Sequence, residues 1–240
     1  AEGKGDIART VVEVWDQADS DSETTLSTTE EKTNGLESWI SEGGLTTHVQ
    51  LAYPGNGRVE TTVERPDQTT ESSTSLGGVT LDRKVSSPVE GTLVQITNEI
   101  DGLDRVKTIT DELTGGSTLF SYYENDLTRT QVVRESIGST ATQTTEFIYD
   151  SMGRLITTVQ PDGSRAESRY FSSGAVRAQY GAGTFPTEYT SDRQGRLSSL
   201  TTWQEFNDAA GAGVSGAAVT ALQYNFCGWL RAKRDQSGRG

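Results

Sequence analysis

A β-hairpin is predicted by Tyr149-Asp150-Ser151-Met152-Gly153-Arg154-Leu155, together with residues 144–148 before it and 156–163 after it. Side chains alternate in polarity on both sides of residues 150–153, and a period of two is typical of strands. Asp at the first position and Gly at the fourth favour a type I turn, because Asp bonds nearby amides and Gly tolerates a positive φ. Gln160-Pro161-Asp162-Gly163 predicts a second type I turn, since Pro161 fixes φ at its second position.

The same unit recurs along the chain. Two further copies follow at 170–176 and 191–197. The turn glycines of the three copies are Gly153, Gly174 and Gly195, so they are evenly spaced. A fourth copy, 224–230, comes after an Ala/Gly-rich run, Asn207 to Ala218, that we expect to be an inserted loop. Upstream, 53–59 and 61–68 repeat the hairpin and the second turn, 100–106 is a weaker copy, and 39–45 and 76–79 are fainter ones. Self-similarity of this kind indicates a repeat architecture in which each unit covers its neighbour.

The residues that carry the repeat signature share a structural role in this interpretation, as turn, capping or strand positions. They are Tyr53, Gly57, Arg58, Asp101, Arg105, Tyr149, Asp150, Gly153, Arg154, Leu155, Pro161, Asp162, Gly163, Tyr170, Gly174, Asp192, Gly195, Arg196, Leu197, Tyr224, Gly228, Asp235, Gly238 and Arg239.

Tyr-Asp-x-x-Gly-Arg-Leu followed by Pro-Asp-Gly resembles the YD repeat of rearrangement-hotspot (RHS) proteins, a family that includes teneurins and the encapsulating subunits of insecticidal toxin complexes. The resemblance covers about two thirds of the chain and is closest at 149–163. It implies a long antiparallel sheet that spirals into a hollow shell, which in bacteria often encloses a C-terminal toxin. The family's Asp-Pro-x-Gly-type motif at the end of the shell is absent, so no residue here is assigned a self-cleaving role.

The chain is expected to have three parts. Residues 1–47 are acidic and irregular, with degenerate repeats, and within them Asp16 to Gly35 is predicted to be a long loop or a frayed linker. Residues 48–144 hold degenerate repeats, with one weak hairpin and long connections predicted over 45–88, and residues 145–240 hold the regular repeats. The segment 234–239 aligns with 149–154 as the opening of another repeat, which predicts a fragment of a longer protein with an unpaired last strand.

Composition narrows the classes of function. The net charge of −13 and the pI near 4.6 argue against a nucleic-acid partner, because polyanions need cationic surfaces. No apolar run is long enough to span a membrane. A single cysteine excludes an internal disulfide, and we expect Cys227 to be a small buried residue.

Each candidate site has a plainer alternative. The only histidine, His48, is expected to be a strand-face residue rather than part of a Ser-His-Asp arrangement or a metal site. The acids Asp16, Asp19, Asp21 and Glu23 lack the spacing of a calcium loop and are expected to be solvated. Paired carboxylates for glycoside hydrolysis stand in no motif.

Two recurring residue types have structural interpretations. Four tryptophans could form a sugar-stacking platform, but packing on the sheet is favoured for Trp15, Trp39, Trp203 and Trp229. Asp and Arg recur four positions apart, which predicts a cross-turn ion pair or a turn-capping Asp at Asp101/Arg105, Asp150/Arg154, Asp192/Arg196 and Asp235/Arg239.

The sequence therefore predicts an all-β fold of repeated antiparallel hairpins in a long, twisted sheet. The favoured function is a non-catalytic structural piece of an RHS/YD-repeat shell or surface element, with no cofactor, metal or catalytic residue. Its expected partners are the rest of its own longer chain and an enclosed toxin domain or a surface glycan, in a secreted or cell-surface setting in bacteria. The alternatives are a carbohydrate- or protein-binding module that uses exposed aromatics, and a hydrolase with unrecognised carboxylates.

Overall fold

The structure is a computed structural model that describes residues 6–15, 23–136 and 138–237, and the chain is built from β-strands throughout these ranges. The strands of the first half are β1 (Ile7–Trp15), β2 (Glu23–Lys32), β3 (Glu37–Glu42), β4 (Leu45–Gly55), β5 (Arg58–Glu64), β6 (Thr70–Leu76), β7 (Val79–Ser87), β8 (Gly91–Ile100), β9 (Val106–Asp111) and β10 (Ser117–Tyr122). Those of the second half are β11 (Thr128–Arg134), β12 (Gln143–Tyr149), β13 (Leu155–Val159), β14 (Arg165–Tyr170), β15 (Val176–Gly181), β16 (Thr187–Ser191), β17 (Leu197–Thr202), β18 (Glu205–Asn207), β19 (Ala212–Ser215), β20 (Ala218–Tyr224) and β21 (Leu230–Arg234).

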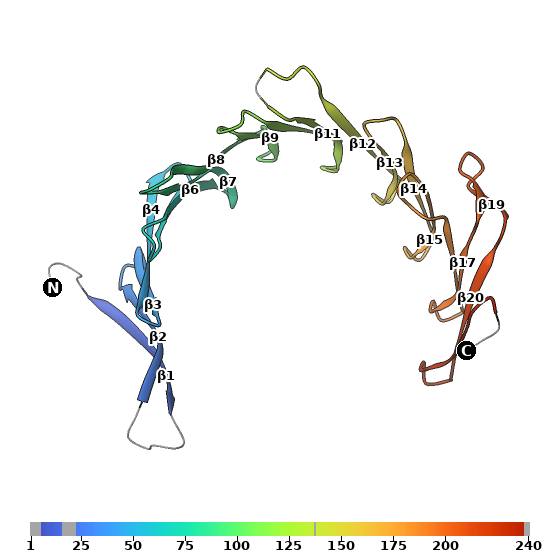
Figure 1. Cartoon of the computed structure of the whole chain (residues 1–240), viewed down its shortest axis with the longest axis horizontal. Coiled ribbons are helices and arrows are strands. Elements are labelled where there is room, and N and C mark those ends of the chain that lie inside the picture. Colours follow the sequence, from blue (N-terminus) through green and yellow to red (C-terminus); the bar gives the residue numbers. More distant parts are fainter. Residues whose placement is uncertain (1–5, 16–22, 137, 238–240) are drawn as a thin grey trace. The chain divides into compact units, whose positions relative to one another are not determined.

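Nineteen of the strands form one antiparallel sheet, and β18 and β19 form a separate two-stranded sheet. Successive strands pair with each other, as the registers of β4 with β5, β5 with β6 and β13 with β14 show. Figure 1 labels most of these strands. The prediction of an all-β fold of repeated antiparallel hairpins is confirmed.

The chain divides into two units by its contacts. The first comprises 1–120 and 133–142, and the second comprises 121–132 and 143–240. Each unit is a run of neighbouring hairpins. Because such a sheet is a single layer, no second layer covers its faces, and most described side chains are partly or fully exposed.

In the first unit the expected loop over 16–35 is wrong for the part that the structure describes. Residues 23–32 are β2, a ten-residue strand that pairs with β1 on one side and β3 on the other. Its Thr-rich sequence suits a strand whose backbone is satisfied by two neighbours, although Leu26 is its only apolar residue. Residues 16–22 lie outside the described ranges.

The weak hairpin with long connections that was predicted over 45–88 is also wrong. The segment forms four strands, β4 to β7, each paired with the next along most of its length. The turn between β6 and β7 consists of Gly77 and Gly78, at φ values of 57° and 86°. Two consecutive positive φ angles match the right-handed twist of a two-residue hairpin, which lets Ser- and Thr-rich strands join tightly.

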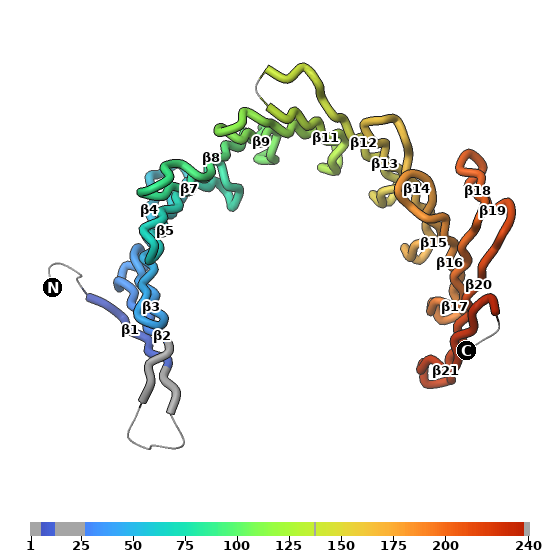
Figure 2. The backbone as a smooth tube through the Cα atoms, viewed as in Figure 1, coloured from blue at the N-terminus to red at the C-terminus, as the bar shows by residue number. Residues whose placement is uncertain are grey.

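In the second unit the run 207–218 is an insertion, but it is not a loop. With residues 205 and 206 it makes the β18–β19 hairpin, while β17 pairs directly with β20 (Figure 2). The hairpin packs on the sheet, where the Phe206 ring lies 5.0 Å from the ring of Tyr180. Tyr180, at 1% exposure, and Ala178, at 3%, are the buried apolar side chains of the described residues. The insertion therefore covers the best-buried point of this unit.

Candidate functional site

The turn at 150–154 has the geometry that its sequence predicts. The Asp150 N–H donates to the Arg154 carbonyl at 2.9 Å, and the Gly153 N–H donates to the Asp150 carbonyl at 3.0 Å. Gly153 has a φ of 76°, and the strand register shifts beside Tyr149. This is a type I turn followed by a glycine bulge, which requires the left-handed conformation that glycine adopts without strain.

The Asp150 carboxylate holds the turn together. Its Oδ1 accepts the N–H groups of Met152 at 2.9 Å and Arg154 at 3.0 Å. Its Oδ2 accepts Arg154 Nε at 2.7 Å and lies 2.6 Å from Nη2. These bonds, first of all the one from the Arg154 side chain, lower the pKa of Asp150 from its ordinary value.

The same bonds recur at two other turns. Asp101 and Arg105 form the pair at 2.6 Å, and hydrogen bonding from Arg105 lowers the pKa of Asp101 to about 2. Asp192 and Arg196 lie 2.7 Å apart. Partial burial acts to raise the pKa of Asp192, but the N–H groups of Arg196 outweigh it and the pKa is lowered. The predicted cross-turn ion pair is confirmed at these three turns.

The fourth predicted pair falls partly outside the described residues, which end before Arg239. Asp235 follows the end of β21, and β21 begins at the turn 225–229. Asp235 therefore lies at the opposite edge of the second unit from turn 150–154. There it accepts Ser237 N–H and hydroxyl bonds at 2.9 and 2.6 Å, as Asp162 does from Ser164. Its position groups it with Asp162 rather than with Asp150.

The arginine of a turn with the Asp–Arg pair, which we call a charged turn, also contacts the next repeat. This contact was not among the expectations from the sequence. The Arg154 guanidinium lies 4.8 Å from the ring centre of Tyr170, and its Nη1 donates to the Phe171 carbonyl at 2.9 Å. The Tyr170 hydroxyl donates back to the Leu155 carbonyl at 2.8 Å. Each side chain thus bonds the backbone of the other's hairpin.

Arg196 and Tyr224 repeat this contact. Their guanidinium and ring lie 4.6 Å apart, and the Tyr224 hydroxyl donates to the Leu197 carbonyl at 2.9 Å. The signal for it in the sequence is the tyrosine that directly precedes the turn, at 170 and 224; Tyr122 and Tyr149 have the same place before their turns.

Charged turns alternate along this edge of the second unit with turns that lack the Asp–Arg pair, which we call uncharged turns although 123–127 contains Glu124 and Asp126. The turns 123–127, 171–175 and 225–229 make the same pair of backbone bonds as 150–154. Where the charged turns have Asp and Arg, these have Tyr123 and Leu127, Phe171 and Ala175, and Asn225 and Trp229.

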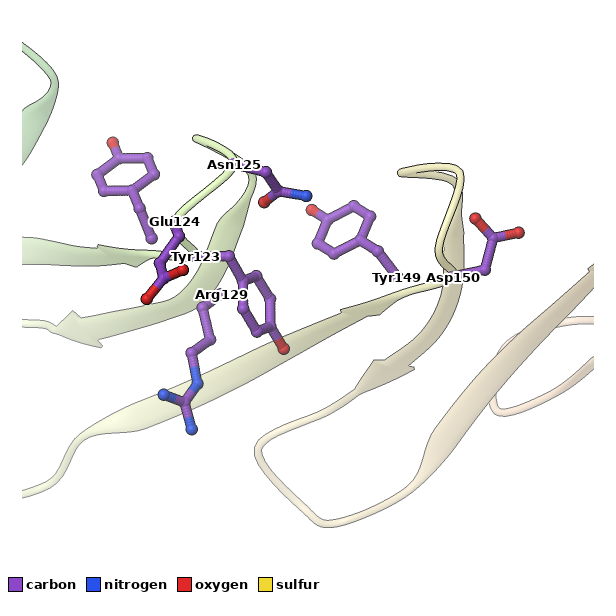
Figure 3. Close-up of a pocket in the computed structure, with 7 residues that line it drawn as sticks. Tyr123, Glu124, Asn125, Arg129, Tyr149 and Asp150 are labelled. Atoms are coloured by element: carbon purple, nitrogen blue, oxygen red, sulfur yellow. The ribbon is translucent and has the colours of Figure 1, made fainter.

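A pocket of the second unit lies beside the first uncharged turn (Figure 3). It has a volume of about 600 Å³ and is lined by Tyr122, Tyr123, Glu124, Asn125, Arg129, Tyr149 and Asp150. The rings of Tyr123 and Tyr149 meet edge to face with their centres 6.1 Å apart. Burial, with the nearby Tyr123, raises the pKa of the Tyr149 hydroxyl.

The upstream signature residues keep the turns but not the side-chain contacts. Tyr53 is 64% exposed, and its hairpin closes through Asn56 and Gly57, both at positive φ, so that Gly55 pairs with Arg58. The second turn is conserved in geometry. Gln68 N–H donates to the Arg65 carbonyl at 2.9 Å, as Gly163 N–H does to the Gln160 carbonyl.

His48 is a strand-face residue, as expected. Its ring stacks on Trp39 with centres 4.8 Å apart, and its Nε2 lies 3.6 Å from a carboxylate oxygen of Glu37. Among the described residues, no group of three or more His, Cys, Asp and Glu side chains is placed to hold a metal ion. The acids at 16, 19 and 21 lie outside the described ranges, and the side chain of Glu23 is likewise not described.

Cys227 is exposed, so its prediction as a buried residue is wrong. It lies in the turn 225–229, where side chains project into solvent, between Phe226 at 100% exposure and Gly228. In the same turn Trp229 is 74% exposed, whereas Trp39 packs on His48. Packing on the sheet therefore describes Trp39 but not Trp229.

Comparison with known proteins gives a fold relationship. No family model and no curated protein matches the chain. The crystal structures of TcdB2-TccC3-Cdc42 and of TcdB2-TccC3 without its hypervariable C-terminal region match 93% and 95% of the chain, each at 13% identity, with TM-scores of 0.53 and 0.54. The chain spans about 12% of the length of each. At this identity the likeness shows a related fold. In the described residues no helix is long and apolar enough to cross a membrane.

Proposed function

We propose that this chain is a non-catalytic wall segment of an RHS/YD-repeat shell, in a secreted or surface-exposed bacterial protein. The observation that carries the proposal is the contact between Arg154 and Tyr170 and its repeat at Arg196 and Tyr224. The most polar signature residues are engaged in joining one hairpin to the next. Residues committed in this way stabilise a sheet and are not available as acids, bases or nucleophiles.

Two further observations support the proposal. The fold is related to that of TcdB2-TccC3, of whose length the chain matches a small part, as expected of one segment of a larger wall. The sheet is also a single layer with few buried side chains, which suits a wall more than a compact domain. In this proposal the partners are the flanking repeats and an enclosed domain, such as a toxin.

The test is cryo-electron microscopy of the complete natural protein that contains this segment. The proposal expects these strands in the wall of a closed cavity, and a compact or filamentous particle would refute it. A parallel assay for hydrolysis of glycans, esters and peptides should detect no turnover by the chain. Turnover that disappears on substitution of one acid would show that the segment is an enzyme.

A binding module is the second candidate, favoured by the exposed aromatics of one turn. Phe226 and Trp229 are 100% and 74% exposed and lie within three residues of each other. If they form a binding surface, Trp229→Ala should abolish a glycan-array signal of the chain. Phe185→Ala, at a 65% exposed aromatic in another connection, is the matched control and should leave it unchanged. An array without any specific signal would exclude glycan binding.

A further inference from the structure

Tyr149, which lines the pocket beside turn 123–127, has counterparts in Tyr170 and Tyr224, which also directly precede turns. Tyr170 and Tyr224 each lie beneath a guanidinium supplied by the preceding charged turn, at 4.8 and 4.6 Å. Tyr149 has the same place in its strand, since Tyr149, Tyr170 and Tyr224 each pair, beside the bulge, with the second residue after the turn glycine. The turn before Tyr149, however, carries Leu127 where the others carry Arg.

The Leu127 side chain lies against the next turn in the same place as the arginine side chain of a charged turn. Its Cδ1 lies 3.6 Å from the position of a Cβ built on Gly153, and Arg196 Nη1 lies 3.6 Å from the equivalent position on Gly228. The two side chains thus cross the next turn in the same place. Leucine is shorter and has no charge, so it cannot place a cation over the next tyrosine.

The pocket offers the groups that a guanidinium requires. The rings of Tyr123 and Tyr149 give aromatic faces, and the Glu124 carboxylate has no ion pair among the described residues. In Figure 3 the Asn125 side chain points toward the Tyr149 hydroxyl, and the Arg129 guanidinium is directed away from Tyr149. Arg129 lies 5.7 Å from the ring centre of Tyr123 instead.

We propose that this pocket binds the guanidinium of an arginine side chain from another polypeptide, over Tyr149, in the place that Arg154 and Arg196 take over Tyr170 and Tyr224. The carbonyl of Asp150 corresponds to that of Phe171, which accepts a bond from Arg154 at 2.9 Å, and it is the expected acceptor for the guest. Glu124 supplies the counter-charge that Asp150 supplies to Arg154.

The test uses the whole chain with isotope-labelled tyrosines, titrated with an acetylated Gly-Arg-Gly amide and followed by NMR. Saturable shifts of the Tyr149 ring signals are expected. The same peptide with citrulline has the shape of arginine without its charge, and we expect it to bind about tenfold more weakly. Equal binding of the two peptides, or no binding of either, would overturn the proposal.

A pair of variants tests the location. Tyr123→Asp with Leu127→Arg converts the uncharged turn into a charged one, and its internal guanidinium should exclude the peptide. The matched control, Phe171→Asp with Ala175→Arg, makes the same conversion at the next uncharged turn and should leave binding unchanged. Undiminished binding by the first variant, with its amide spectrum intact, would refute the site.

A single change at the rim covers the case in which the first variant does not fold. Glu124 is exposed, so Glu124→Gln should leave the fold intact. It should weaken the arginine peptide but not the citrulline peptide. Equal effects on both peptides would refute the electrostatic role that the proposal gives to Glu124.

Discussion

Gly181→Ala should weaken the β14–β15 hairpin far more than Gly163→Ala does. Gly181 ends β15 at a φ of +95° and pairs with Ala166 of β14. A Cβ at this position would overlap the Arg165 carbonyl oxygen and lie 3.3 Å from Ala166 Cα. That carbonyl also accepts the Ala182 N–H at 2.7 Å, so it is held in place.

The magnitude follows from two separate costs. A left-handed backbone costs a non-glycine residue roughly 1–2 kcal/mol, and forcing atoms apart in a packed structure costs roughly 1–3 kcal/mol. Their sum for Gly181→Ala is roughly 2–5 kcal/mol. Gly163→Ala is the matched control, because Gly163 has a φ of +82° and no atom lies within 4 Å of its added Cβ. It should carry only the first cost, roughly 1–2 kcal/mol.

Native-state hydrogen exchange is the appropriate assay, because repeats of a long sheet open locally and a single melting temperature averages over them. Amides of β14 and β15 should exchange faster in Gly181→Ala, by a factor that corresponds to the larger cost. Gly163→Ala should accelerate exchange less. Equal acceleration in the two variants would refute the argument from the backbone overlap, and acceleration confined to Gly163→Ala would reverse it.

Three further predictions concern the turns. Gly153→Val should lower the melting temperature more than Met152→Val, because Gly153 has a φ of 76° and Met152 is 66% exposed; equal melting temperatures would contradict the turn geometry. Asp101, with its pKa lowered from 3.8 to about 2, binds fewer protons when folded, so the stability of its turn should be constant above about pH 5 and fall from there toward pH 2. Asp101→Asn should remove this dependence as measured by amide exchange. Cys227 should react with a maleimide in the folded chain as fast as in urea, and strong protection would contradict its exposure.

The turns could be predicted from the sequence because their determinants are local. Asp150 reaches amides two and four residues ahead, and Gly153 supplies the positive φ within the same turn. Neither depends on the rest of the chain. The same reasoning held for the second turn at Asp162, where the Ser164 N–H and hydroxyl bond the carboxylate.

The polar strands could not be predicted from composition. β2 and β6 contain few apolar residues, and a sequence of this kind is typical of loops in compact domains. In a single-layer sheet the strand is held by the ladder on each side, so a Thr- or Ser-rich sequence is sufficient. The insertion at 207–218 could not be predicted from composition either. Its Ala and Gly residues are typical of a loop, whereas in the structure the contact of Phe206 with Tyr180 holds a hairpin on the sheet.

The contact between the arginine of one turn and the tyrosine before the next depends on strand register, so it could not be predicted from the sequence. It also accounts for which residues occupy these two positions along the second unit. Arg154 and Arg196 each face a tyrosine, and where the arginine is replaced by Ala175 the facing position is Ser191. Both residues are then small, as expected if the arginine and the tyrosine stabilise the sheet only as a pair. The pair Leu127 and Tyr149 differs from this pattern, because a tyrosine stands at the second position without an arginine at the first. A half-buried ring kept without its internal cation is a position at which an external one gains a contact that the fold does not already satisfy.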